Sequence, residues 1–254
     1  MAHSGMVRGQ GSAPGSGFSV SPIIIAADQT PTEFLDLLGK TAKARWRLLF
    51  RPPPPTPPTD RSRSALILGT LIGESYLIWQ AGDAQQFRNT NQDIVSYCRT
   101  LGVGDKLMPR LMAQGKMAES AQWKELGQEI TDGHHELQRL LLDMQDEDLA
   151  LLIDTGMWLR MLEIASTLVA DNPEGEACPL CVGTPSTLNE MRVRFGQISA
   201  RQREAPLLQR IGAMIDETIK VWQGTEDRAP GVQAVLKTRR SLEVLMDAIW
   251  VKDK

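Results

Sequence analysis

Cys178 and Cys181 form the most specific short motif of the chain, a Cys-Pro-Leu-Cys sequence. Such a pair can be a redox dithiol, half of a zinc site or a local disulfide. A redox dithiol is typical of a strand–helix context, which this segment does not show, and a zinc site needs further ligands that only Cys98 and the pair His134/His135 could supply. We therefore expect no cofactor here, but a loop disulfide or two ordinary thiols, with zinc as the alternative.

Glu74 and Arg160 are charged residues inside two strongly apolar segments, 65–79 and 149–170. A buried charge without a partner is costly, so we predict that the Glu74 carboxylate pairs with a cation, and Arg160 is the best candidate. A carboxylate in a pocket could act as an acid, a base or a ligand anchor, whereas a buried ion pair would fix the register of two helices. We expect the structural ion pair, with a binding pocket as the alternative.

Gly69 and Gly73 lie four residues apart in the first apolar segment, and Gly156 lies midway along the second. Glycine inside a helix costs about 1 kcal/mol relative to alanine, so it usually has a packing reason. We expect these two helices to cross closely at the centre of the protein.

Asp132 and His135 are spaced i, i+3, as carboxylate and histidine are in di-iron bundles. Those bundles need two such helices and two further glutamates, and the sequence has no second internal helix with histidine. We therefore interpret the segment around His134 and His135 as a solvated helix face. The sequence also shows no phosphate-binding glycine loop, no Gly-x-Ser-x-Gly and no His-Glu-x-x-His, so we expect a protein that is not an enzyme.

The pattern of apolar residues predicts an all-α bundle without strands. Asp60, Asp83 and Asp146 are candidate N-caps, Gly82 is a candidate left-handed helix end, and Pro185 and Pro206 suit the first turn of a helix. The helices are expected over 31–50, 61–81, 84–102, 105–115, 118–145, 147–170, 185–203, 206–222 and 232–250. No segment offers the roughly 20 uninterrupted apolar residues that a membrane-spanning helix needs.

Four regions follow from composition: a disordered or degenerate signal-like segment (1–29), a basic helical arm (30–51), a polyproline linker (52–59) and a helical domain (60–254). Residues 18–27 resemble the end of a weak signal peptide, with Ala26-Ala27 as the cleavage site. Pro22 and a single preceding arginine, Arg8, oppose that interpretation. We expect a periplasmic or exported protein, with the cytoplasm as the alternative.

The net charge of −3 lacks the basic excess that is typical of a dedicated nucleic-acid binder, so we expect no nucleic-acid partner. The charge is uneven, because residues 40–63 hold seven Lys or Arg against one Asp. This arm could dock on the acidic remainder of the chain, on an anionic membrane or on a nucleic acid, and docking within the protein or an oligomer is the simplest explanation. The polyproline segment could also be bound by a proline-recognition domain.

Three stretches, 45–55, 64–73 and 146–160, resemble uncharacterised helical proteins of bacteria that are often encoded with a signal peptide. The similarity spans about 28–172 and implies an all-α fold and export, but no catalytic residue. We predict a non-enzymatic helical binding or scaffold protein that associates with an unknown protein partner or with itself. The alternative is a small-ligand or metal-binding bundle that uses Cys178 and Cys181, or a pocket at Glu74 and Arg160.

Overall fold

The computed structural model describes residues 30–41, 44–171, 185–222 and 231–250, and these contain ten α-helices, one 3₁₀ helix and no strand. The prediction of an all-α protein is therefore confirmed. The elements are α1 Pro31–Thr41, the 3₁₀ helix η1 Trp46–Leu49, α2 Arg61–Ala81, α3 Ala84–Thr100, α4 Gly104–Glu119, α5 Trp123–Asp143, α6 Glu147–Asp171, α7 Pro185–Gln197, α8 Ala200–Arg203, α9 Pro206–Trp222 and α10 Val232–Trp250.

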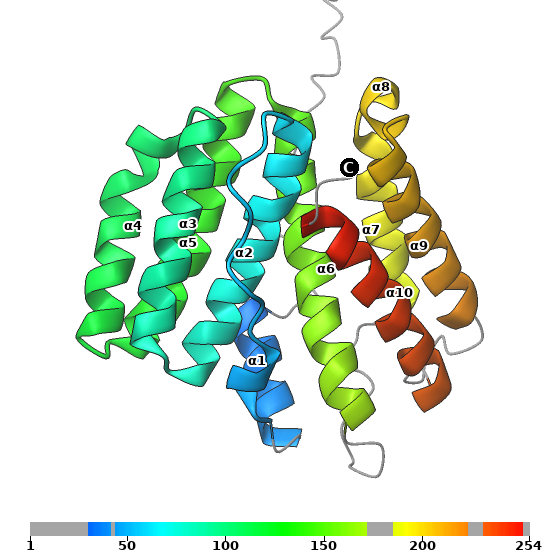
Figure 1. Cartoon of the computed structure of the whole chain (residues 1–254), viewed down its shortest axis with the longest axis horizontal. Helices are drawn as coiled ribbons and strands as arrows, with labels where there is room; N and C mark the ends of the chain where they lie inside the picture. Colours follow the sequence, from blue (N-terminus) through cyan, green and yellow to red (C-terminus); the bar gives the residue numbers. More distant parts are fainter. Residues whose placement is uncertain (1–29, 42–43, 172–184, 223–230, 251–254) are drawn as a thin grey trace, which may run out of the picture.

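The helices α2 and α6 pack against each other at the centre of the fold. Both are apolar around their whole circumference, and a helix of that kind is stable in water only when other elements surround it. Helices α3, α4 and α5 cover one side of the central pair, and α7, α9 and α10 cover the other side (Figure 1). No helix in the described ranges is both long and apolar enough to cross a membrane.

The crossing of α2 and α6 depends on glycine. A Cβ atom on Gly69 would lie 2.0 Å from the carbonyl oxygen of Ile153, and one on Gly156 would lie 2.1 Å from the carbonyl oxygen of Leu66. Because these obstacles are backbone atoms, side-chain movement could not remove them. The predicted close approach of the two helices is therefore confirmed.

Several helix ends follow the predicted capping residues. The Asp60 carboxylate accepts hydrogen bonds from the amides of Ser62 and Arg63 at the start of α2, and Gly82 ends the helix with a φ of +63°. Asp83 caps α3 through the Gln86 amide. Helices α9 and α10 begin and end at their predicted residues.

Three predicted helices are divided in the structure. The chain turns at Ala121, where φ is +53°, so the helix expected over 118–145 begins only at Trp123. The carbonyl oxygen of Trp123 accepts a hydrogen bond from the Trp79 indole NH at 2.5 Å, which connects the start of α5 to α2. Gly115 lies inside α4 instead of ending it, because packing outweighs the modest helix penalty of one glycine. The segment 31–50 is divided into α1 and η1, and 185–203 into α7 and α8.

The basic arm and the polyproline segment lie on the body of the protein. Phe34 and Leu35 from α1 are fully buried in the same core as α2 and α6. The polyproline segment follows α2 along its length (Figure 1), and Tyr97 of α3 donates a hydrogen bond to the Pro55 carbonyl oxygen at 2.8 Å. Residues 30–41 and 44–59 thus act as a strap that is fixed to the helices, and the expected docking of the arm within the protein is observed.

Gly69→Ala should destabilise the fold severely, because the new Cβ would meet backbone on α6 and force the central helices apart. We expect a loss of about 3 kcal/mol or more in the free energy of unfolding, measured by urea denaturation. Gly115→Ala is the matched control, since its Cβ would meet only the Asn91 side chain at an ordinary 3.6 Å. That change should be neutral or stabilise by up to about 1 kcal/mol. Equal effects of the two substitutions would contradict the proposed packing.

Candidate functional site

Glu74 and Arg160 form a buried ion pair between α2 and α6. The Arg160 guanidinium donates from Nε and Nη2 to Oε2 of Glu74, each at 2.7 Å, and both residues are only 3% exposed. Gly73 makes room for the pair, because a Cβ there would lie 3.0 Å from the Arg160 side chain. The predicted pairing of Glu74 with Arg160 is therefore confirmed.

Two further residues extend this pair into a four-charge cluster of Arg51, Glu74, Arg160 and Glu163. Glu163 accepts hydrogen bonds from Arg160 Nη1 at 2.6 Å and from Arg51 Nη2 at 2.6 Å. The Arg51 amide donates to Oε1 of Glu74 at 3.0 Å, and Arg160 Nη2 donates to the carbonyl oxygen of Leu49 at 2.5 Å. Two guanidinium groups thus balance two carboxylates, and both arginines also connect the strap to the central helices.

The charges of the cluster favour the ionised forms of Glu163 and Arg160. Burial raises the pKa of the Glu163 carboxyl, but the charges and hydrogen bonds of Arg160 and Arg51 outweigh this effect and hold that pKa below its usual value. For Arg160, burial lowers the pKa, but Glu74 and Glu163 outweigh it and raise the pKa above its usual value. Glu163 and Arg160 are therefore both charged near neutral pH, and neither is poised to exchange a proton there.

The four-charge cluster also reaches α10. The guanidinium carbon of Arg51 lies 5.5 Å from the centre of the Trp250 ring, and Arg51 Nη1 lies 3.8 Å from the Asp247 carboxylate. A ligand at Glu74 would therefore have to displace groups of the protein itself, because Arg160 and the Arg51 amide already occupy the carboxylate oxygens. The geometry suits a structural anchor between the strap, α2, α6 and α10.

A second buried polar group contains His134, Gln138 and Asp154. His134 Nε2 lies 3.0 Å from Oδ1 of Asp154, and the Gln138 amide nitrogen donates to the same oxygen at 2.7 Å. Since an ionised carboxylate can only accept, and the Gln138 amide can use its two hydrogens on Asp154 and the Ala150 carbonyl oxygen, the ring NH at Nε2 is assigned as a donor to Asp154. Arg194 of α7 approaches the other carboxylate oxygen at 3.7 Å. This group connects α5, α6 and α7.

The interpretation of His134 as part of a solvated helix face is wrong. His134 is 5% exposed, because it continues the buried stripe of α5 that includes Ile130, Leu137 and Leu141. His135, the next residue, is exposed as expected. Partial burial is the main cause that lowers the pKa of the His135 imidazole, and the charge of the neighbouring His134 is the second cause.

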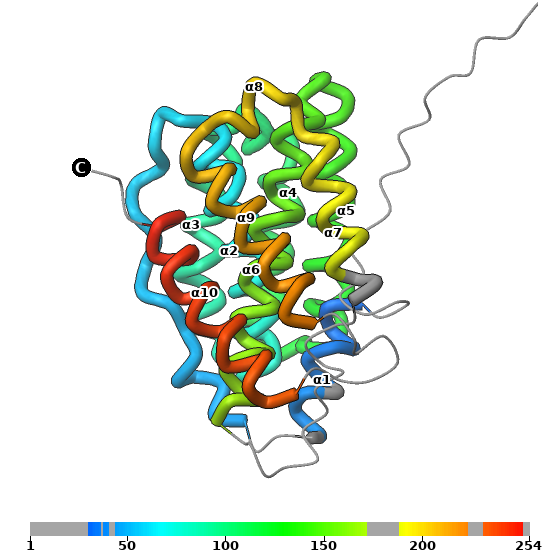
Figure 2. The backbone as a smooth tube through the Cα atoms, turned by 90° about the vertical axis from the view of Figure 1, so that its right-hand side faces the viewer, coloured from blue at the N-terminus to red at the C-terminus, as the bar shows by residue number. Residues whose placement is uncertain are grey.

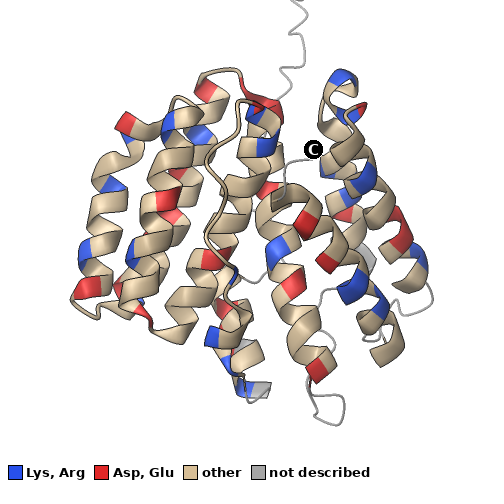
Figure 3. Cartoon of the chain, viewed as in Figure 1, with Lys and Arg blue, Asp and Glu red and all other residues tan. Residues whose placement is uncertain are grey.

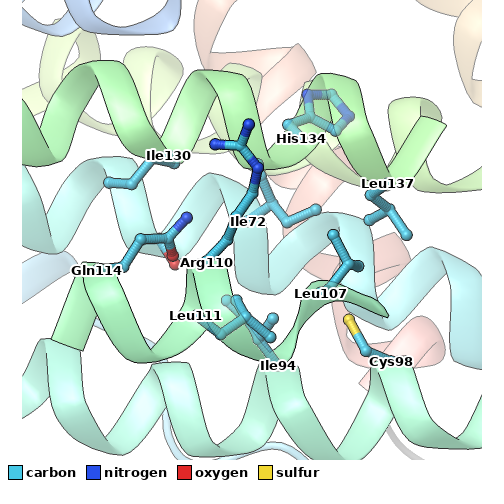
Figure 4. Close-up of a pocket in the computed structure, with 12 residues that line it drawn as sticks. Ile72, Ile94, Cys98, Leu107, Arg110, Leu111, Gln114, Ile130, His134 and Leu137 are labelled. Carbon is cyan, nitrogen blue, oxygen red and sulfur yellow. The ribbon is translucent and has the colours of Figure 1, made fainter. Parts of the chain in front are cut away.

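A small cavity of about 30 Å³ lies between α2, α3, α4 and α5 (Figure 4). Its lining is mostly isoleucine and leucine, with Cys98, Arg110, Gln114 and His134 as the main polar residues. The volume suits one or two water molecules. Burial raises the pKa of the Cys98 thiol to about 12, so the thiol is protonated and a poor nucleophile near neutral pH. A cysteine–histidine nucleophilic pair is not assembled at this cavity.

Metal binding by the described part of the chain has no support in its geometry. Among the residues that the structure describes, no three His, Cys, Asp or Glu side chains converge in a way that could hold an ion. Cys178 and Cys181 lie outside the described residues, so the disulfide and zinc alternatives for that motif stay predictions.

Two larger concavities lie on the outer surface, along α9. One has a volume of about 390 Å³ between α7 and α9, and its lining includes Phe195, Gly196 and Gly212. The other has a volume of about 700 Å³ and includes Lys237 of α10. The first lies on the α7 side of α9 and the second on its α10 side, and the two adjoin at Ala213 and Asp216; we call them together the α9 groove. No local sequence pattern indicates this groove, because its lining residues come from four separate helices, α7, α8, α9 and α10.

Replacing the Glu163 carboxylate tests the four-charge cluster through pH. Because the folded protein holds the pKa of Glu163 below its ordinary 4.5, the carboxylate stabilises the fold above that pH and loses its contribution as the pH falls through the folded value. At pH 7, we expect Glu163→Gln to lower the free energy of unfolding by about 3 kcal/mol in urea denaturation. The variant should also lose less stability than the natural protein as the pH falls below 4.5.

Glu119→Gln is the matched control, since Glu119 pairs with Arg88 at an exposed site. This substitution should change the unfolding free energy by less than about 1 kcal/mol. A Glu163→Gln protein that is as stable as the control, with the pH dependence of the natural protein, would contradict the anchoring role of the cluster.

Comparison of the chain with protein-family models, curated proteins and solved structures finds no match. The resemblance to uncharacterised helical proteins of bacteria stays a prediction. The functional inference therefore depends on the geometry of the chain itself: buried charges that satisfy one another, a small cavity and an open groove along α9.

Proposed function

We propose that the protein is a non-enzymatic helical binding protein, and that its partner is a protein chain that contacts the α9 groove. The observation that carries this proposal is the position of the open concavity. The buried carboxylates Glu74, Glu163 and Asp154 are engaged by other side chains of the protein. The largest concave surface described above instead lies on the outside of α7, α9 and α10.

The shape of the α9 groove favours a helix or another extended segment over a small molecule. Ligand pockets usually surround most of the surface of a compound, whereas this groove is shallow and runs along one helix. Gly196, Gly212 and Ala213 line it, and residues this small allow a partner backbone to approach closely. Phe195 and Leu208 provide an apolar floor. Amphipathic helices commonly bind to grooves of this kind.

Charges of both signs surround the α9 groove. Arg192 pairs with Asp216 across it, and Lys237 pairs with Glu217 at 3.0 Å. Figure 3 shows both signs interspersed along α7, α9 and α10. A mixed rim around a small apolar floor resembles the general composition of protein–protein interfaces, in which polar residues surround the contact centre.

Site-specific photo-cross-linking in cells of the source organism tests the proposal. We expect a discrete adduct when Ala213 is replaced by a benzoylphenylalanine photo-cross-linker, because position 213 lies in the groove. The same replacement at Met112, an exposed residue of α4, is the control and should not give that adduct.

The protein in the adduct must then bind the purified chain directly. Its binding should be lost in Ala213→Glu, with the urea unfolding curve unchanged. Identical adducts at positions 213 and 112, or no adduct at 213, would contradict a binding role for the groove.

A further inference from the structure

We infer that the partner at the α9 groove is a second copy of this chain, with α9 packed antiparallel on α9 of the other copy across a two-fold axis at Ala213. This inference rests on the proposed binding function and names the partner. The helix α9 packs on α7 and α10, and it lies between them on the outer side of the protein (Figure 2).

Ala213 lies at the centre of the exposed face of α9. The exposed residues of the helix recur at spacings of three and four, so they share one stripe: Pro206, Gln209, Arg210, Ala213, Glu217 and Lys220. Ala213 lies close to the midpoint of the helix, which spans Pro206–Trp222, and near the middle of the stripe. A small residue at this point allows two helices to approach each other closely, at the short end of the usual 8–10 Å between axes.

The charges of the exposed stripe are self-complementary only in the antiparallel direction. Arg210 lies three residues before Ala213, whereas Asp216 and Glu217 lie three and four residues after it. A two-fold axis at Ala213 therefore brings Arg210 of each copy opposite the acidic residues of the other copy, and it does so twice. A parallel arrangement would place Arg210 against Arg210 and Glu217 against Glu217.

The charged groups are at the surface, and each acidic residue already has one partner within the chain: Asp216 pairs with Arg192, and Glu217 with Lys237. Arg210 is exposed and makes no ion pair with the described residues. Glu217 pairs with Lys237 at the surface, with both side chains more than half exposed, so the Glu217 carboxylate retains capacity for a second donor. Lys237 lies two helical turns before Val244, which is 63% exposed and adds apolar area to the same layer.

The size of the α7–α9–α10 layer suits a stable dimer. A helix of 17 residues is roughly 25 Å long, and three neighbouring helices at about 10 Å spacing are roughly 30 Å wide. The layer therefore has a projected footprint on the order of 750 Å² per copy, an upper bound on the contact that is comparable with the roughly 800 Å² per partner of a standard interface.

Charge exchange across the two-fold axis tests the inference with the full chain. We expect size-exclusion chromatography with light scattering to show a concentration-dependent dimer of about 56 kDa, twice the 28.1 kDa of one chain. Arg210→Glu and Glu217→Arg should each raise the dimer dissociation constant about tenfold or more, because each places like charges opposite one another twice.

Mixing the two single variants should restore most of the association, since both contacts between positions 210 and 217 then pair an arginine with a glutamate. The double variant, Arg210→Glu with Glu217→Arg, should dimerise by itself for the same reason. Met112→Glu on α4 is the control and should leave the dimer unchanged. Unchanged urea unfolding curves would show that the variants fold.

A monomer at every concentration, or a dimer that the charge exchanges leave unaffected, would overturn the inference. The in-cell adduct at position 213 separates this failure from failure of the proposed function. An adduct with a different protein would retain the α9 groove as a binding site and exclude the second copy as its occupant. A monomeric chain without any adduct specific to position 213 would contradict both.

Discussion

The four-charge cluster of Arg51, Glu74, Arg160 and Glu163 is the interaction on which the arrangement of the helices depends. Buried charges are expensive unless each has a partner, and here two guanidinium groups and two carboxylates satisfy one another. Apolar residues of similar volume could give equal stability, so we attribute to the cluster a gain in specificity. It fixes one position for the strap on α2 and α6, and Gly73 provides the space that the Arg160 side chain needs.

Local signals in the sequence were sufficient for the fold class, for most helix ends and for half of the cluster. Asp60 and Gly82 mark α2 because capping depends on neighbouring residues, and Glu74 with Arg160 could be paired because each interrupts an apolar run. Arg51 is 112 residues from Glu163, and composition placed it in a basic arm, so their contact became apparent only from the tertiary structure.

Contacts between distant parts of the chain also explain why the prediction for His134 is wrong and why the sequence does not indicate the α9 groove. The polar residues around His134 favour a solvated face, but its spacing from Ile130 and Leu137 fits the buried stripe of α5. The groove combines residues of α7, α8, α9 and α10, whose packing no local pattern specifies. A body held rigid by buried charges on one side of α6 can present such a surface with little loss of conformational freedom on binding.

Amide hydrogen exchange of the natural protein and of Glu163→Gln tests the central claim most directly, that the four-charge cluster holds the strap in place. We predict faster exchange in 44–60 and at the end of α10, the two regions that Arg51 connects, and unchanged protection in α3, α4 and α5. Equal protection of 44–60 in both proteins would contradict the claim, because the strap would then be held without the cluster.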